Sequence, residues 1–525
     1  MPPAARFLAW CLLALVLAVT WQLSRTTVRE RAEAAEVLRG VVLAAGRPVS
    51  GASVRIVGRP TAAVTDRRGR FTLPLAEADR AANARVAASL DGFFIAGADA
   101  HSQPIAINLT RLPPRDETAY DWVDPRPSAG DEHRCGNCHA EIYDEWSASA
   151  HARSATNRRF LNVYDGSDWH GRPDQGWNLL SEFPEGAGVC YSCHFPSAQP
   201  SIEVTADLRR VADVDRQGVH CDFCHKVSAT TVEHVGLNHG RFAMSLLRPA
   251  GEGQVFFGPL DDVDRGEDAY RALYRDSRYC ASCHEGTMFG VRAYETYSEW
   301  RASPQAKAGV QCQDCHMAST GRMTNFAPGH GGREREAATL ASHRLPGADP
   351  DFLREHLGLS VQARRGAAGL EVETEVRVNG VGHRTPTGHP TRALLLHVEA
   401  VTDDGQRLAM MEGPVLPALC GEGPSDVPGL SGQPGKLFAK VLRGVDGELG
   451  APFWRASGVA YDTRLNADQV DRTAFIFTTH PGTIRVAARL IYRHFSKPQA
   501  DAKHWPDNEI VVVSRHVQLG ITSPQ

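Results

Sequence analysis

Five copies of the pattern Cys-x-x-Cys-His lie between residues 135 and 316, and they constrain the chain more than any other feature. They use ten of the 12 cysteines in 525 residues. At the observed frequencies of cysteine and histidine, chance would produce about 0.01 copies, and the pattern is the one that attaches c-type haem covalently. The cysteines predicted to bind haem are Cys135, Cys138, Cys190, Cys193, Cys221, Cys224, Cys280, Cys283, Cys312 and Cys315.

The spacing within the pattern has a physical reason. Two cysteines three positions apart on a helical turn present both thiols to one porphyrin, and the histidine that follows reaches the iron from the same side. Zinc-binding or redox C-x-x-C sites are the alternative, but they do not explain a histidine at the same place five times. The predicted cofactors are therefore five c-type haems. The predicted proximal iron ligands, in motifs 1 to 5, are His139, His194, His225, His284 and His316.

The N-terminus carries an export signal. Phe7–Val19 is uninterrupted apolar sequence preceded by Arg6, which is the layout of a signal sequence. We expect an uncleaved membrane helix that anchors the chain on the periplasmic side of the inner membrane. A cleaved signal peptide and a periplasmic or secreted protein are the second interpretation, and a buried core helix is the third. Export agrees with haem attachment, because thioether chemistry belongs outside the reducing cytoplasm.

The pattern along the chain predicts a multidomain fold. Residues 37–112 contain short β-prone runs separated by turns, and from residue 358 onward strict alternation returns, as in Leu370–Val378. The motif region leaves about 36 residues per haem, so the haems must supply much of its core. The expected parts are a signal anchor and spacer (1–36), a small β-sandwich (37–112), a mostly α-helical or irregular pentahaem domain (132–347), and a C-terminal β-rich, sandwich-like domain (358–525).

The spacing of the motifs indicates an internal repeat. Successive first cysteines lie 55, 31, 59 and 32 residues apart. Gly-Val-x precedes both Cys221 and Cys312, and the segments 145–149 and 299–303 share Glu-Trp-x-Ala-Ser. After the first of these segments stands His151, where the second copy has Gln305. The repeat therefore preserves a scaffold and changes a potential ligand.

Seventeen histidines lie outside the motifs, and five irons need a sixth ligand if every haem is bis-histidine. His151 and His343 are the leading candidates, because one follows motif 1 closely and the other stands after motif 5. His383 lies in a polar Gly-His loop of the C-terminal region, where a plain hairpin histidine is the alternative. The further candidate distal ligands are His220, His234, His239 and His330.

Axial ligation separates an electron carrier from an enzyme. Two imidazoles leave no substrate position on the iron, whereas an open sixth position permits reduction of a small nitrogen or sulfur compound. We expect an electron carrier, with the reductase or oxidase as the alternative, and redox proteins as partners. The net charge of −4 gives no basic field for nucleic acid. The predicted protein is a membrane-anchored periplasmic cytochrome c.

Three stretches resemble known families. Three features of residues 132–347 carry the first resemblance: Trp-x-x-Ser-x-His at 146–151, the two G-V-x-C-x-x-C-H motifs, and His-Arg-Leu-Pro-Gly from 343. With these features the region resembles the multihaem cytochromes c that include the tetrahaem electron acceptor of hydroxylamine oxidoreductase. That family implies stacked haem pairs and electron transfer. Residues 37–110, with G-x-P-V-x-G-A-x-V and T-D-x-x-G-x-F, resemble carboxypeptidase-regulatory-like β-sandwiches. The Gly-His-x-x-Pro-Thr-Gly loop looks like the β domain appended to many multihaem cytochromes.

Overall fold

The computed structural model describes residues 37–75, 84–102, 104–184, 188–198, 211–231, 238–251, 253–422 and 429–520. Packing divides the chain into two compact units. Unit 1 comprises residues up to 112 together with 260–270, and unit 2 comprises 113–259 together with 271–525. All five motifs and the C-terminal strands belong to unit 2, so the candidate sites are built within one unit.

Unit 1 contains two four-stranded sheets. Strand β1 pairs with β2, β5 and β8 in one sheet, and the other has the order β4-β3-β6-β7. Alternation places Val42, Val54, Leu73 and Ile105 in one apolar cluster. The strands are β1 (Val37–Ala44), β2 (Arg47–Pro48), β3 (Ser53–Ile56), β4 (Ala62–Val64), β5 (Arg70–Pro74), β6 (Arg85–Ser89), β7 (Ala96–Asp99) and β8 (Ile105–Asn108), with β12 (Asp268–Tyr270) in the second segment.

The motif region of unit 2 is built from short helices and small hairpins. The longest described helices in it, α3 and α4, have eight residues each, and helices of this length are marginal in isolation. The helices are α2 (Cys135–Cys138), α3 (Ala140–Ser147), α4 (Arg158–Asp165), α5 (Leu179–Glu182), α6 (Gly188–His194), α7 (Cys221–His225), α8 (Arg278–His284), α9 (Thr296–Arg301), α10 (Pro304–Lys307), α11 (Cys312–His316) and α12 (Pro350–His356). The strands are β9 (Val227–Thr230), β10 (Met244–Leu246), β11 (Phe256–Gly258), β13 (Glu285–Met288) and β14 (Val291–Glu295).

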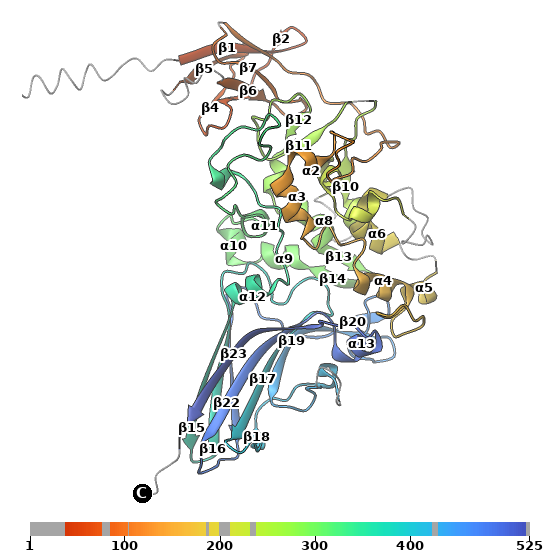
Figure 1. Cartoon of the computed structure of the whole chain (residues 1–525), viewed down its shortest axis with the longest axis vertical. Coiled ribbons are helices and arrows are strands. Elements are labelled where there is room, and N and C mark those ends of the chain that lie inside the picture. Colours follow the sequence, from red (N-terminus) through yellow and green to blue (C-terminus); the bar gives the residue numbers. More distant parts are fainter. Residues whose placement is uncertain are drawn as a thin grey trace, which may run out of the picture. The chain divides into compact units, whose positions relative to one another are not determined.

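The C-terminal part of unit 2 has two sheets of long strands (Figure 1). Their orders are β15-β16-β21-β18 and β20-β19-β17-β22-β23. Strand β16 buries Leu370, Val372, Val376 and Val378 on one face, as its alternating sequence predicts. The strands are β15 (Leu357–Gly366), β16 (Gly369–Val378), β17 (Ala393–Thr402), β18 (Met410–Glu412), β19 (Gly435–Gly444), β20 (Ala456–Asp462), β21 (Val470–Phe477), β22 (Ile484–Arg493) and β23 (Glu509–Leu519), with helix α13 (Lys497–Ala502).

One part of the expected fold class was wrong. Across the described ranges, no helix is both long and apolar enough to cross a membrane. The expectation of a membrane-spanning helix, and with it that of a chain anchored at the inner membrane, is therefore not upheld. Residues 1–36, in which that helix was expected, lie outside the described residues. What the structure contains is a multidomain chain with β-rich regions and a region of short motif helices.

Candidate haem sites

Each of the five motifs forms its own short helix. Helices α2, α6, α7, α8 and α11 carry motifs 1 to 5 in that order. In α2 the turn is closed by a hydrogen bond from the backbone N–H of His139 to the carbonyl of Cys135 (2.9 Å). All ten motif cysteines are free thiols, and Cys315 alone among them is exposed. The helices thus present paired thiols on one turn, which is the arrangement that attachment to a porphyrin needs.

Backbone carbonyls orient four of the five proximal histidines. When Nδ1–H donates to a carbonyl, the unprotonated Nε2 is left to bind a metal. The Nδ1 contacts are His139 with Phe326 O (2.8 Å), His194 with Ser154 O (2.8 Å), His225 with Phe257 O (2.6 Å) and His316 with Pro346 O (2.8 Å). The imidazoles are therefore held in the orientation and tautomer of iron ligands.

His383 of the C-terminal region faces His316 of motif 5. An imidazole nitrogen bonds a metal at about 2.0–2.1 Å and the ring centroid lies about 1.1 Å behind it, so two imidazoles on opposite sides of one iron have centroids about 6.3 Å apart. The rings of His316 and His383 are 6.3 Å apart, with their planes inclined by 12°. Nδ1 of His383 contacts the carbonyl of Arg384 (2.9 Å), which again leaves Nε2 for iron. The pair fits a bis-histidine haem.

His151 faces His284 of motif 4 in the same way. Their ring centroids are 6.2 Å apart, with planes inclined by 80°. The carbonyl of His151 accepts the backbone N–H of Val219 (3.1 Å), so the residue is tied to the segment before motif 3. Gly218, with φ +68°, packs against that carbonyl, and a Cβ there would lie 2.4 Å from it. Burial lowers the pKa of His151 to about 4, so the ring is neutral and able to bind a metal at neutral pH.

His343 lies near motifs 1 and 3. Burial first, and then the neighbouring His225, lower the pKa of His343 to about 4. The backbone N–H of His343 donates to Oε2 of Glu145 in α3 (2.7 Å). Its side-chain Nδ1 is buried without a hydrogen-bond partner among the described residues. A buried neutral imidazole of this kind suits a ligand position.

The other predicted candidates lie in different settings. His220 is fully buried at the start of α7, where the backbone N–H of Phe223 donates to its Nδ1 (3.3 Å), an arrangement that places the proton on Nε2. His239 precedes the short 3₁₀ turn Gly240–Ala243. His330 is exposed on a turn. His234 lies outside the described residues.

His389 is a buried histidine that the sequence analysis did not select. It lies six residues after His383 in the same loop, and its ring packs against those of Tyr294, Phe453 and Phe495 at 5.7–5.9 Å. Burial first, then the Arg392 guanidinium and the neighbouring His194, lower its pKa to about 3. The repetition of Gly-His at residues 382–383 and 388–389 is the sequence signal that could have identified His389.

Contacts between motifs join all five into one network. Thiols of different motifs lie close enough together to perturb one another's pKa. The thiol contacts are Cys135 with Cys221, Cys193 with Cys283, and Cys280 with Cys312. Motif 3 meets motif 4 where the Tyr279 hydroxyl donates to the carbonyl of Cys224 (2.9 Å). Motif 1 therefore contacts motif 3, motif 3 contacts motif 4, and motif 4 contacts motifs 2 and 5.

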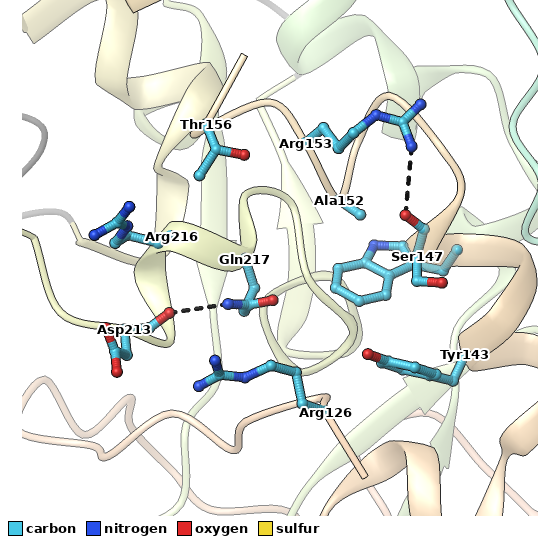
Figure 2. Close-up of a pocket in the computed structure, with 10 residues that line it drawn as sticks. Arg126, Tyr143, Ser147, Ala152, Arg153, Thr156, Asp213, Arg216 and Gln217 are labelled. Atoms are coloured by element: carbon cyan, nitrogen blue, oxygen red, sulfur yellow. Dashed lines mark hydrogen bonds between the residues drawn. The ribbon is translucent and has the colours of Figure 1, made fainter. Parts of the chain in front are cut away.

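A polar pocket of about 380 Å³ lies beside α3 (Figure 2). Arg126 and Arg216 line it, together with Asp213. Arg153 turns its guanidinium to the carbonyl of Ser147 (3.5 Å). Arg126 donates from Nε to Oδ1 of Asp124 (3.0 Å), a residue that does not line the pocket. Because two of its three guanidiniums have partners in the protein, the pocket is not a built anion site.

Comparison with known proteins finds a match in sequence and a match in fold. A family model described as cytochrome c554 and c-prime matches residues 134–226, which contain motifs 1 to 3. The crystal structure of a penta-heme cytochrome c552 from Thermochromatium tepidum has a similar fold, with a TM-score of 0.53 and 20% identity over 73% of this chain and 97% of that chain. No curated protein matches the sequence.

The predicted resemblance to multihaem cytochromes c is therefore confirmed. This resemblance supports haem binding and electron transfer by the chain. The resemblance of residues 37–110 to carboxypeptidase-regulatory-like modules stays a prediction.

Proposed function

We propose that the chain carries five haems, one at each motif, and relays electrons among them. The observation that carries this proposal is the pairing of motif histidines with distant histidines at 6.2 and 6.3 Å, the separation that one bridging iron requires. Haem iron, when bound, accepts and releases single electrons, and its axial ligands set the potential. The contacts among all five motifs support electron passage between neighbouring haems.

The protein's own residues have defined roles in this proposal. His151 and His383 are the distal ligands for motifs 4 and 5, and His343 serves motif 3. For motifs 1 and 2 the candidates are His220, His234, His239 and the newly recognised His389, whereas His330 on its exposed turn has no role in this proposal. Carbonyl bonds to Nδ1 hold four of the five proximal rings in place during electron transfer, so little rearrangement accompanies a change of iron charge at those haems. Attachment through thioethers favours a periplasmic protein.

The test uses the purified holoprotein. Its denatured chain should carry the added mass of five covalent haems, and the reduced protein should show c-type absorption bands. Electron paramagnetic resonance should show low-spin iron, and carbon monoxide should not bind. The double variant Cys312→Ser, Cys315→Ser should carry four haems.

Two results would count against the relay. A wild-type chain with fewer than five covalent haems refutes the stoichiometry. High-spin iron that binds carbon monoxide, together with turnover of nitrite, hydroxylamine or sulfite, would replace the relay with the reductase.

A further inference from the structure

Two helices of the motif region make the same tryptophan contact. Trp146 in α3 donates its Nε1–H to the carbonyl of Val219 (2.9 Å), and Trp300 in α9 donates to the carbonyl of Val310 (2.9 Å). Each valine stands two residues before the first cysteine of a motif, motif 3 in one case and motif 5 in the other. The two indoles therefore anchor equivalent haem-binding turns.

Thiol contacts extend this equivalence to two pairs of motifs. The first cysteine of motif 1, Cys135, contacts the first cysteine of motif 3, Cys221. In the same way Cys280 of motif 4 contacts Cys312 of motif 5. Motifs 1 and 3 thus form one copy of a structural repeat and motifs 4 and 5 the other, with motif 2 outside it.

The glutamate before each tryptophan bonds a segment that carries a histidine. In the first copy, Oε2 of Glu145 accepts the backbone N–H of His343, 198 residues further along the chain (2.7 Å). Glu145 and Trp146 are neighbours on one helical turn. That turn therefore holds both the proximal motif, through the indole, and the distant histidine segment, through the carboxylate.

The second copy repeats the arrangement with additional support. Oε2 of Glu299 accepts the backbone N–H of Arg384, the residue after His383, at 3.3 Å, and the hydroxyl of Thr387 at 2.7 Å. Its other oxygen accepts from the buried guanidinium of Arg464 (2.6 Å). The Glu299 side chain is 7% exposed, so these bonds are shielded from water.

We propose that Glu145 and Glu299 are equivalent positioning residues, which fix the distal-ligand segments of His343 and His383 opposite motifs 3 and 5. This inference rests on the proposed electron relay. Long loops carry both histidines, and each would lose conformational freedom on binding iron. A carboxylate on the helix that also anchors the proximal turn sets the separation of the two imidazoles before iron binds.

The experiment compares alanine variants of the holoprotein by electron paramagnetic resonance and by the number of carbon monoxide molecules bound per chain. Wild type should bind none. Glu145→Ala and Glu299→Ala should each create about one high-spin, carbon monoxide-binding haem per chain, and the double variant about two. The conservative variants Glu145→Gln and Glu299→Gln, which keep an acceptor oxygen, should remain low-spin. Added imidazole should restore the low-spin signal of the alanine variants.

Combination with ligand variants assigns each effect to one haem. His383→Ala should by itself open one haem, and Glu299→Ala in that background should open no second one. Adding Glu299→Ala to His343→Ala should instead give two open haems. A general loosening of the structure would not follow this pattern. It would raise the number of open haems in the His383→Ala background as well as in the His343→Ala background.

Control variants keep the test decisive. Glu399→Ala removes a carboxylate on β17 that faces Arg407 (3.5 Å), and it should leave all haems low-spin. If Glu299→Ala yields no folded holoprotein, Thr387→Val removes one bond to Glu299 without unpairing Arg464. It should give a measurable carbon monoxide-binding fraction, where wild type should bind none.

Distinct results separate this inference from the proposed function. Five low-spin haems in wild type, with both alanine variants also low-spin and inert to carbon monoxide, overturn the positioning role alone. A second open haem in Glu299→Ala, His383→Ala also overturns it. A wild-type chain without covalent haem overturns the relay itself.

Discussion

Replacing Lys440 with methionine should loosen the C-terminal strands from the motif region. Lys440 in β19 is 2% exposed, and its Nζ donates to the carbonyls of Arg292 (3.0 Å) and Ala293 (3.0 Å) and to Oε2 of Glu295 (2.7 Å). Those three acceptors belong to β14 and its end, next to the helix that carries Trp300. Methionine keeps the length of the side chain and removes every donor.

The expected loss is large because the acceptors stay buried. Removing one partner of a buried ion pair costs about 3–5 kcal/mol. Here the two carbonyls lose their donor, and Glu295 keeps only its longer contacts with Arg464 (3.3 Å) and Arg292 (3.6 Å). At about 1.4 kcal/mol per power of ten, the local opening equilibrium should rise by roughly two to three and a half powers of ten. Glu295→Gln in the same background should recover part of the loss, since it removes a carboxylate that has lost its nearest cation.

The matched control is Lys436→Met on the same strand. Lys436 pairs with Asp471 but is 34% exposed, so its loss should cost less than about 1 kcal/mol. Hydrogen exchange measured by mass spectrometry on the holoprotein reports opening of β14 and of residues 383–389, and guanidinium unfolding reports the overall change. If the two methionine variants differ by less than about 1 kcal/mol, the buried-donor argument is refuted.

Three further outcomes are expected. His151→Ala should create one high-spin haem that binds carbon monoxide, whereas His330→Ala, at an exposed turn, should create none. Trp300→Phe removes an indole bond and should lower the free energy of unfolding by about 1 kcal/mol; an unchanged guanidinium midpoint would contradict this. Burial raises the pKa of Asp168, but hydrogen bonds from Arg172 outweigh it and lower the pKa from 3.8 to about 2. That stabilisation is present above pH 4 and is lost as the pH falls toward 2, so thermal melts of Asp168→Asn and wild type should differ at pH 7 and converge near pH 2.

The haem-binding turns could be recognised without a structure because they are local. Five residues decide where both thiols and the proximal imidazole stand on one turn, so the pattern alone identified ten cysteines and five histidines. Strand alternation in Leu370–Val378 was equally readable, since period two reports one buried face. The export signal was also local, but its interpretation as a membrane anchor was wrong for the part of the chain that the structure describes.

The partners of the irons depended on tertiary structure. His383 stands 67 residues from His316, and His151 stands 133 residues before His284, so no spacing rule connects either pair. The alternating gaps showed that a repeat exists, but the thiol contacts determined that motif 1 pairs with motif 3 and motif 4 with motif 5. The sequence by itself determined where haem would be attached, because attachment needs only neighbours in the chain. Which histidine would complete each iron depends on the fold, because that choice requires loops brought together from distant positions.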